Sequence, residues 1–292
     1  MNPTIQTGND PLEKNHRNRS NYIRSLVTKI SENSEIPEAY SPPTPRRIVQ
    51  FWHDLEQLPG DVRHCMESWS QLEEIGFERH VFDLRKAGDF IDRRLGKRYR
   101  KTFEKCCHPA MHSDYFRLCY IFSEGGCYVD SDDVYLGVCL DPLFSDGRLK
   151  LQPLCYDMST DGMIPPSIFT SPTANSLSWI IYFNNNPLIA ASGHPVIERA
   201  LLSATNLIEK SSSAHFPDIQ STTGPGNLSK SIYDLSQETN HIENSLLIVR
   251  DWENIASTKW SLCYRNDGRN WRLADRYPNW QDRGHMQMEE DR

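Results

Sequence analysis

The sequence predicts an α/β protein with a mainly parallel central sheet flanked by helices. From residue 47 onward, short apolar runs with strand character alternate with helical segments, and such alternation is typical of parallel sheets. The 292 residues, 38% hydrophobic and 24% charged, are enough for one sizeable core. Three aspartates follow one of the apolar runs directly, and α/β proteins place ligand-binding groups at strand ends.

The expected elements follow from local periodicity and from turn residues. The expected strands cover 48–52, 78–83 and 127–129, and further apolar runs occupy 179–183 and 246–249. The expected helices cover 62–75, 110–124 and 196–208, with polar helical residues between 84 and about 105. Gly125 and Gly126 supply the stop that the helix over 110–124 needs.

The chain is predicted to contain one main domain between two tails. Residues 1–44 are rich in Asn, Ser, Pro and charge, a composition typical of a linker or tail. A short helix within it, around 22–30, could dock on the main domain or on a partner. The main domain covers 45–285, and we expect 286–292 to be a disordered tail.

Composition excludes several classes of function. A net charge of −7 and a pI near 5.8 argue against nucleic-acid binding, and no apolar run is long enough to span a membrane. Because no signal peptide is visible at the start, we expect a cytoplasmic protein, a membrane-peripheral one, or one exported without a Sec signal. The eight cysteines lack metal-binding or redox spacing, so we interpret them as reduced thiols.

The basic stretch over 93–101 is the strongest run of like charge in the chain. We interpret it as the solvated face of a helix. The alternative is a phosphate or membrane contact.

The acidic cluster is the most informative feature of the sequence. Asp130, Asp132 and Asp133 stand within four residues, directly after an apolar strand. Carboxylates this close raise one another's pKa and oppose ionisation. A divalent cation with oxygen ligands removes that conflict. The alternative is a solvated acidic turn.

The helix before the cluster carries a second polar pair. Asp114 and Arg117 are three residues apart, so they share a helix face and can contact each other. Helix, glycine turn, strand and carboxylates form one compact unit, which places both residues near Asp130 and Asp132. The alternative is an exposed ion pair of little energetic consequence.

These residues together resemble a known family. The spaced positions over 112–117 and 125–132 resemble the DXD block of a glycosyltransferase family that uses sugar nucleotides. It includes initiating α-1,6-mannosyltransferases and capsular-polysaccharide transferases, and is more distantly similar to clostridial glucosylating toxins. Residues 47–53, 184–195 and 222–226 resemble further blocks of the family in the expected order. The resemblance covers roughly 46–230 and implies a GT-A type, Rossmann-like fold.

The resemblance implies roles for particular residues. Asp130 and Asp132 would hold Mn²⁺ or Mg²⁺, with Asp132 as the direct ligand and Asp130 as ligand or ribose contact. Asp133 is either a supporting residue behind them or a surface residue at the strand end. Trp52 would stack on the nucleotide base, although it could equally be an ordinary core aromatic.

Polar side chains around the acidic cluster would contact the sugar. Asp114 and Arg117 would bind the sugar or phosphate, and Asn185 or Asn186 would contact the sugar or acceptor. Gly224 would serve backbone geometry and His194 the start of a helix. The implied reaction is a retaining transfer from a nucleotide-diphosphate sugar to a glycan, a lipid-linked saccharide or a protein.

Two other functions stay open at this level. A haloacid-dehalogenase-like phosphatase also places Asp-x-Asp after an apolar strand and would use the first aspartate as nucleophile. A catalytically silent nucleotide-sugar-binding protein would keep the fold alone. The family's C-terminal closing motif, a His or Ser-x-Trp type, has only scattered candidates in Trp260, Trp280 and His285.

Overall fold

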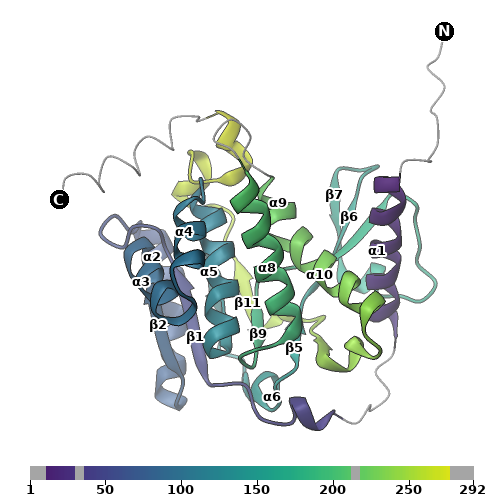
Figure 1. Ribbon diagram of the computed structural model, residues 1–292, viewed down its shortest axis with the longest axis horizontal. Coiled ribbons are helices and arrows are strands. Elements are labelled where there is room, and N and C mark those ends of the chain that lie inside the picture. Colours follow the sequence, from purple (N-terminus) through teal and green to yellow (C-terminus); the bar gives the residue numbers. More distant parts are fainter. Residues whose placement is uncertain (1–10, 30–35, 212–217, 277–292) are drawn as a thin grey trace.

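The computed structural model describes residues 11–29, 36–211 and 218–276. Its centre is a six-stranded sheet in the order β10-β5-β9-β3-β1-β2, covered by helices (Figure 1). The neighbours β10/β5, β3/β1 and β1/β2 are parallel, and β9 is antiparallel to both β3 and β5. The predicted fold class, α/β with a mainly parallel sheet flanked by helices, is confirmed.

The strands are short and are followed by the connections that carry the site. The central strands are β1 (Arg47–Phe51), β2 (Glu78–Phe82), β3 (Gly126–Tyr128), β5 (Leu149–Leu151), β9 (Leu188–Ala190) and β10 (Leu246–Ile248). A two-stranded sheet pairs β4 (Asp133–Tyr135) with β11 (Ala256–Thr258), and a three-stranded antiparallel sheet contains β6 (Pro153–Asp157), β7 (Gly162–Ile164) and β8 (Trp179–Phe183).

The helices lie between these strands or around them. The α-helices are α1 (Pro11–Thr28), α2 (Gly60–Glu67), α3 (Leu84–Leu95), α4 (Lys97–Glu104), α5 (Pro109–Glu124), α6 (Asp141–Phe144), α7 (Pro166–Phe169), α8 (Pro195–Lys210), α9 (Ile219–Thr222) and α10 (Pro225–Glu238). Short 3₁₀ helices are η1 (Glu38–Tyr40), η2 (Ser68–Ile75), η3 (Ile242–Ser245), η4 (Trp252–Asn254), η5 (Cys263–Asn266) and η6 (Trp271–Arg276).

Successive strand residues point to opposite faces of the sheet, so each face has its own core. Val49 and Tyr128 face a large core built with α3, α5, α8 and α10. Their neighbours Ile48 and Cys127 face a second core that contains Trp69 and, from the C-terminal part, Trp252. The central strands are therefore buried on both sides, as expected for a mainly parallel sheet.

The strand register gathers distant segments at one edge of the sheet. Val49 pairs with Tyr128, so the residues after β1 and β3 leave the sheet side by side. Tyr128 also pairs with Leu188 of β9, and β9 runs in the opposite direction. The residues before β9, 184–186, therefore lie at the same edge as the acidic cluster.

A tight turn joins α5 to β3. Gly125 and Gly126 have φ angles of +67° and +108°, which glycine adopts without strain. A Cβ on Gly125 would lie 2.8 Å from the Ser192 nitrogen, and one on Gly126 would lie 2.9 Å from the Arg47 oxygen. Both positions therefore require glycine for their backbone conformation and for lack of space.

Three sequence expectations differ in detail. The helix expected over 62–75 is the α-helix α2 followed by the 3₁₀ helix η2. Two hydrogen bonds hold the start of η2: the Trp69 indole donates to the Asp133 carbonyl (3.0 Å), and the Tyr135 amide donates to the Ser68 hydroxyl (2.8 Å). The apolar run over 179–183 forms β8 of the small sheet rather than a central strand.

The third difference concerns the helix expected around 22–30, which extends over Pro11–Thr28. It packs on β8 and α10, where Ile23 and Val27 are fully buried. No helix within the described ranges is both long enough and apolar enough to cross a membrane. The expected tail at 286–292 lies outside the described residues.

Candidate functional site

A cavity of about 720 Å³ opens at the edge of the sheet where β1, β3 and β9 meet. Every site residue that the sequence predicts lines it: Trp52, Asp114, Arg117, Asp130, Asp132, Asn185 and Asn186. Residues of the C-terminal segment 256–272 also line it, together with Met163 and Tyr182 of the small sheet. The structure therefore brings the predicted residues together in one place.

Helix α5 presents its first turns to this cavity. His108 is its N-cap and accepts a hydrogen bond from the Ala110 amide (3.1 Å), and Pro109 occupies the first helical position, where a missing N–H costs nothing. The other ring nitrogen of His108 lies 2.9 Å from the Gly268 carbonyl. Asp114 and Arg117 follow one and two turns later on the inner side of the helix, both buried.

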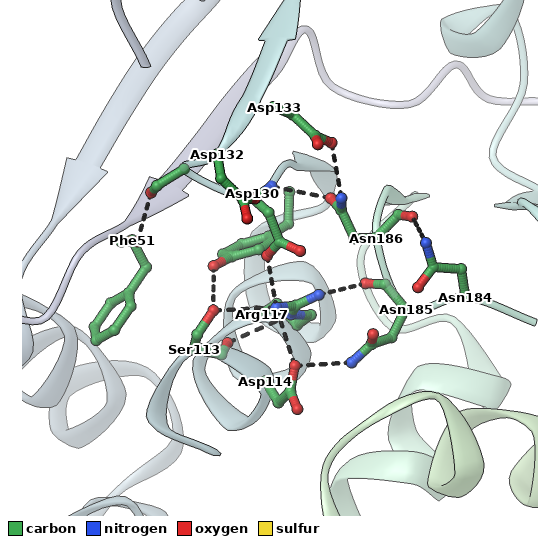
Figure 2. Close-up of polar contacts among 12 residues, drawn as sticks. Phe51, Ser113, Asp114, Arg117, Asp130, Asp132, Asp133, Asn184, Asn185 and Asn186 are labelled. Carbon is green, nitrogen blue, oxygen red and sulfur yellow. Dashed lines mark hydrogen bonds and ion pairs between the residues drawn. The ribbon is translucent and has the colours of Figure 1, made fainter. Parts of the chain in front are cut away.

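Arg117 is the centre of the polar floor of the cavity, which we define as Asp114, Arg117, Asp130 and Asn185 (Figure 2). Its Nη2 lies 2.8 Å from Asp130 Oδ1 and 3.0 Å from Asp114 Oδ1, and its Nη1 donates to the Asn185 carbonyl (2.7 Å). The Asn185 amide in turn donates to Asp114 Oδ1 (2.9 Å). The buried cation is thus fully paired, which a stable buried charge requires.

Burial and neighbouring charges shift the pKa values of the ionisable groups in the floor. Burial raises the pKa of Asp114, against the opposing effects of Arg117 and of the hydrogen bonds from Asn185 and Thr223. Burial also raises the pKa of Asp130, and the nearby carboxylates of Asp132 and Asp133 raise it further. Burial works to lower the pKa of Arg117, but Asp130 and Asp114 outweigh it and the pKa is raised. Such mutual perturbation in a cavity is typical of functional sites.

The three aspartates after β3 have different surroundings. The Asp130 side chain is 32% exposed at the cavity wall, and its backbone N–H donates to Asn186 Oδ1 (2.9 Å). Asp133 is buried, with Oδ2 bonded to the Asn186 amide (2.8 Å) and Oδ1 to the Thr258 hydroxyl (2.6 Å). Asp133 is therefore a supporting residue behind the cavity wall and not a surface residue (Figure 2).

Asp132 is held from the opposite side by a C-terminal segment of which the sequence offered only Trp260 as a candidate. We call Thr258, Trp260, Tyr264 and Arg265 the roof; all four line the cavity. The Tyr264 hydroxyl donates to Asp132 Oδ2 (2.6 Å), and Arg265 Nη2 forms an ion pair with the same oxygen. The Lys259 amide donates to the Asp132 carbonyl (2.9 Å). No local signal could have revealed these contacts, because the partners are more than 120 residues apart in the chain.

Of the three scattered C-terminal candidates, only Trp260 falls in the described part of the chain. It lies in the roof, is 65% exposed, and its ring is 4.5 Å from the Arg265 guanidinium carbon. Trp280 and His285 lie outside the described residues.

Trp52 is a core aromatic residue that also reaches the cavity. It packs with Val62, Met66 and Leu262 in a small core, yet it lines the cavity. Its side chain is 7% exposed, and the Tyr264 ring meets it edge-on at 5.3 Å. Its indole nitrogen has no hydrogen-bond partner among the described residues.

The donor set fits a divalent cation that shares its coordination with a substrate. Within the described ranges, no three His, Cys, Asp or Glu side chains converge as a complete protein-borne metal site. Asp130 and Asp132 each have one oxygen engaged by an arginine, and their other oxygens accept no hydrogen bond from the described residues. Two carboxylates, completed by phosphate oxygens and water, suit Mg²⁺.

Comparison with known proteins agrees with the sequence motif. Residues 59–148 match the family model described as "Glycosyltransferase sugar-binding region containing DXD motif", so the resemblance to a DXD-containing glycosyltransferase family is confirmed. This stretch, which contains α5, β3 and the acidic cluster, is glycosyltransferase-like. The chain is also similar to a solved structure named "PaToxG Glycosyltransferase", at 14% identity over 76% of this chain and 77% of that chain, with a TM-score of 0.44. No curated protein matches the chain.

Proposed function

We propose that the protein is a divalent-metal-dependent glycosyltransferase that moves a sugar from a nucleotide-diphosphate sugar to a hydroxyl acceptor, with retention of the α-configuration. The observation that carries the proposal is the floor of the cavity. A buried arginine there is shared by two carboxylates and an asparagine carbonyl, beside the glycosyltransferase-like Asp-x-Asp pair.

The floor has the chemistry for binding a sugar. Arg117 is paired with both Asp114 and Asp130, so the floor presents fixed donors and acceptors and, with both carboxylates ionised, an excess of one negative charge. Asp114 Oδ2, which the Thr223 hydroxyl approaches at 3.3 Å, faces sugar hydroxyls as acceptor, and the Asn185 amide fixes its orientation. Rigid groups of this kind orient a substrate with little loss of conformational entropy.

Asp130 and Asp132 are the groups that would hold Mn²⁺ or Mg²⁺. When bound, such a cation neutralises the charge that develops on the departing diphosphate. Asp133 has no direct role in this proposal. It fixes the side chain of Asn186, whose Oδ1 accepts a hydrogen bond from the Asp130 backbone N–H. Trp52 and Tyr264 form the aromatic wall next to which the base would lie.

The alternatives are weaker on specific grounds. A phosphatase would need Asp130 as a free nucleophile, whereas its carboxylate is paired with Arg117. A silent binding protein would have the same floor and differs only in turnover, so it remains an outcome of the test. We further propose that 45–285 form the transferase domain and that it acts in the cytoplasm on a glycan, lipid-linked or protein acceptor.

The test is a panel of donors with Mn²⁺. The purified protein is incubated with UDP- and GDP-sugars, and release of UDP or GDP is measured with and without Mn²⁺. We expect one donor to be hydrolysed in the presence of Mn²⁺ and to raise the melting temperature by mass action. Asp132→Ala should abolish hydrolysis, whereas Asp141→Ala, which removes an exposed partner of Arg46, should not.

A flat response to every donor, both in melting temperature and in nucleotide release, would contradict the proposal. Stabilisation by one donor without any turnover, in the presence of candidate acceptors, would instead favour the silent binding protein.

A further inference from the structure

Asp132 already has a positively charged partner within the protein, the guanidinium of Arg265. Tyr264 and Arg265 both bond to its Oδ2, and the side chains of Asp132 and Arg265 are each 13% exposed. A charge-assisted bond with so little water around it is stronger than a typical surface ion pair. Arg265 thus neutralises the carboxylate that a divalent cation would use.

Arg265 and Arg117 are bound very differently. Arg117 contacts two carboxylates and a backbone carbonyl and is 4% exposed. Among the described residues, Arg265 has one carboxylate partner; its Nε donates to the Lys259 carbonyl (3.1 Å), and Trp260 covers its guanidinium. Arg265 therefore has one strong charged partner to lose, whereas Arg117 cannot move without unpairing two carboxylates, of which Asp114 is buried.

The backbone around Arg265 is anchored independently of that ion pair. The Cys263 amide donates to Asp61 Oδ2 (2.7 Å), and β11 pairs with β4. The Asn270 side chain holds the Arg265 carbonyl (2.7 Å). The guanidinium can therefore change partner by side-chain rotation while the roof stays in place.

Electrostatics makes a divalent cation and Arg265 competitors for Asp132. A cation at Asp132 brings two positive charges next to a guanidinium in a poorly hydrated wall, and this repulsion is much larger there than in water. A diphosphate removes this competition, because it offers Arg265 an anionic partner that can accept two parallel hydrogen bonds, the bidentate arrangement that guanidinium groups prefer.

We propose that Arg265 is a built-in counter-ion of Asp132 that moves to the diphosphate when the metal and nucleotide bind together. It keeps the affinity of the free protein for divalent cations low and makes the binding of cation and nucleotide mutually cooperative. The inference depends on the proposed function, because it assumes that a nucleotide diphosphate enters this cavity.

The test measures Mn²⁺ binding rather than catalysis. Free Mn²⁺ is followed by electron paramagnetic resonance while Mn²⁺ is titrated into wild type, Arg265→Met and Arg199→Met. The control, Arg199→Met, removes an arginine of α8 that pairs with Glu238 of α10. It changes the net charge by the same amount as Arg265→Met. Titrations are run without nucleotide and with UDP or GDP, corrected by nucleotide blanks without protein.

Without nucleotide, Arg265→Met should bind Mn²⁺ about ten-fold more tightly than wild type, which corresponds to the loss of one charge-assisted bond at the competing group. Arg199→Met should match wild type. The nucleotide should raise the Mn²⁺ affinity of wild type strongly and that of Arg265→Met much less. Arg265→Lys, which keeps the charge, should behave more like wild type.

The outcomes separate the two proposals. Equal or weaker Mn²⁺ binding by Arg265→Met, with a wild-type circular dichroism spectrum and melting temperature, overturns the counter-ion role and leaves the proposed function standing. If neither nucleotide induces Mn²⁺ binding in wild type or in the variants, both proposals are wrong.

Discussion

The floor and the roof of the cavity each place one arginine on one DXD aspartate, but they do so in opposite ways. Arg117 and Asp130 are thirteen residues apart within one helix–turn–strand unit, and Arg117 is almost fully buried. Arg265 and Asp132 are 133 residues apart and are joined only by the folded chain. The floor is thus part of the core, whereas the roof is a surface segment resting on it.

This difference indicates how the two regions divide their tasks. A buried, fully paired cation contributes fixed geometry, and removing it leaves charges that cannot be solvated. The Arg265–Asp132 pair has a single carboxylate and can be exchanged by rotation of one side chain. On the proposed function, the floor would orient the substrate and the roof would respond to ligands, and each prediction below probes this division.

The largest expected effect is on stability, at the floor. Arg117→Met should lower the free energy of unfolding by about 3–5 kcal/mol, because it leaves the buried Asp114 and the partly exposed Asp130 without their cation. Urea denaturation measures this. Arg265→Met should cost less, about 1.5 kcal/mol, because it removes one charge-assisted bond while Asp132 keeps its bond to Tyr264; equal losses in the two variants would show that the comparison is wrong.

The next largest effect is on donor hydrolysis and concerns Asp132, the aspartate that the roof contacts. Asp132→Asn keeps the size of the side chain and its bond to Tyr264, so we expect a stability close to wild type. Donor hydrolysis should fall by roughly a hundred-fold or more, corresponding to about 3 kcal/mol of lost charge stabilisation. Nucleotide release with saturating Mn²⁺ is the measurement. Full activity in Asp132→Asn would remove Asp132 from the proposed site.

A pH effect arises at the far end of the molecule. His194 caps α8 as His108 caps α5: it accepts from the Val196 amide (3.3 Å), and its other ring nitrogen lies 3.1 Å from the Ser245 carbonyl. Burial, assisted by the charge of Lys150 and opposed by the Ser245 carbonyl, lowers the pKa of His194 to about 4.

The sign of that pH effect follows from which state binds the proton. Between about pH 6.5 and 4 the unfolded chain protonates this histidine and the folded chain does not, so stability falls as the pH decreases through this window. The loss attributable to His194 is at most about 3 kcal/mol. His194→Asn, which keeps an N-cap, should flatten thermal denaturation profiles between pH 6.5 and 4.5; an unchanged slope would assign the effect to other groups.

The smallest effect concerns the link between floor and roof. His108→Asn keeps the N-cap of α5 but loses the contact with the Gly268 carbonyl. We expect amide hydrogen exchange in 263–270 to quicken about five-fold, equivalent to about 1 kcal/mol, with α5 still protected. His194→Asn is the matched control and should leave exchange in the roof unchanged. Loss of protection along α5 in His108→Asn would mean that the cap, and not the contact, had been lost.

The sequence was sufficient for Asp114, Arg117 and Asp130 of the floor because the information that joins them is local; Asn185, 68 residues from Arg117, was predicted only from the family resemblance. Asp114 and Arg117 are one helical turn apart, and the glycine turn returns the chain along the helix to Asp130. Each step is a short-range rule, so the cluster could be predicted without knowledge of the tertiary fold. The small sheet was missed because its apolar run over 179–183 has the same pattern as a central strand.

Of the roof, only Trp260 was a candidate from the sequence. Tyr264 and Arg265 could not be predicted, because they stand in the short 3₁₀ helix η5 and their position beside Asp132 depends on β11 pairing with β4 across more than a hundred residues. Thr258 likewise acquires its role only through Asp133. The docked helix α1 was anticipated in part: a helix around 22–30 was expected to dock on the main domain or on a partner, and its residues Ile23 and Val27 become core residues against β8 and α10.

The two glycines between α5 and β3 have a practical consequence for anyone who engineers this protein. Because neither position tolerates a Cβ, this two-glycine turn fixes how the end of α5 is placed relative to the start of β3. Insertions or deletions in this connection would shift the guanidinium of Arg117 away from Asp130 even if every side chain were retained. Transplanting the floor of the cavity to another scaffold would thus mean moving 108–133 without interruption, together with Asn185.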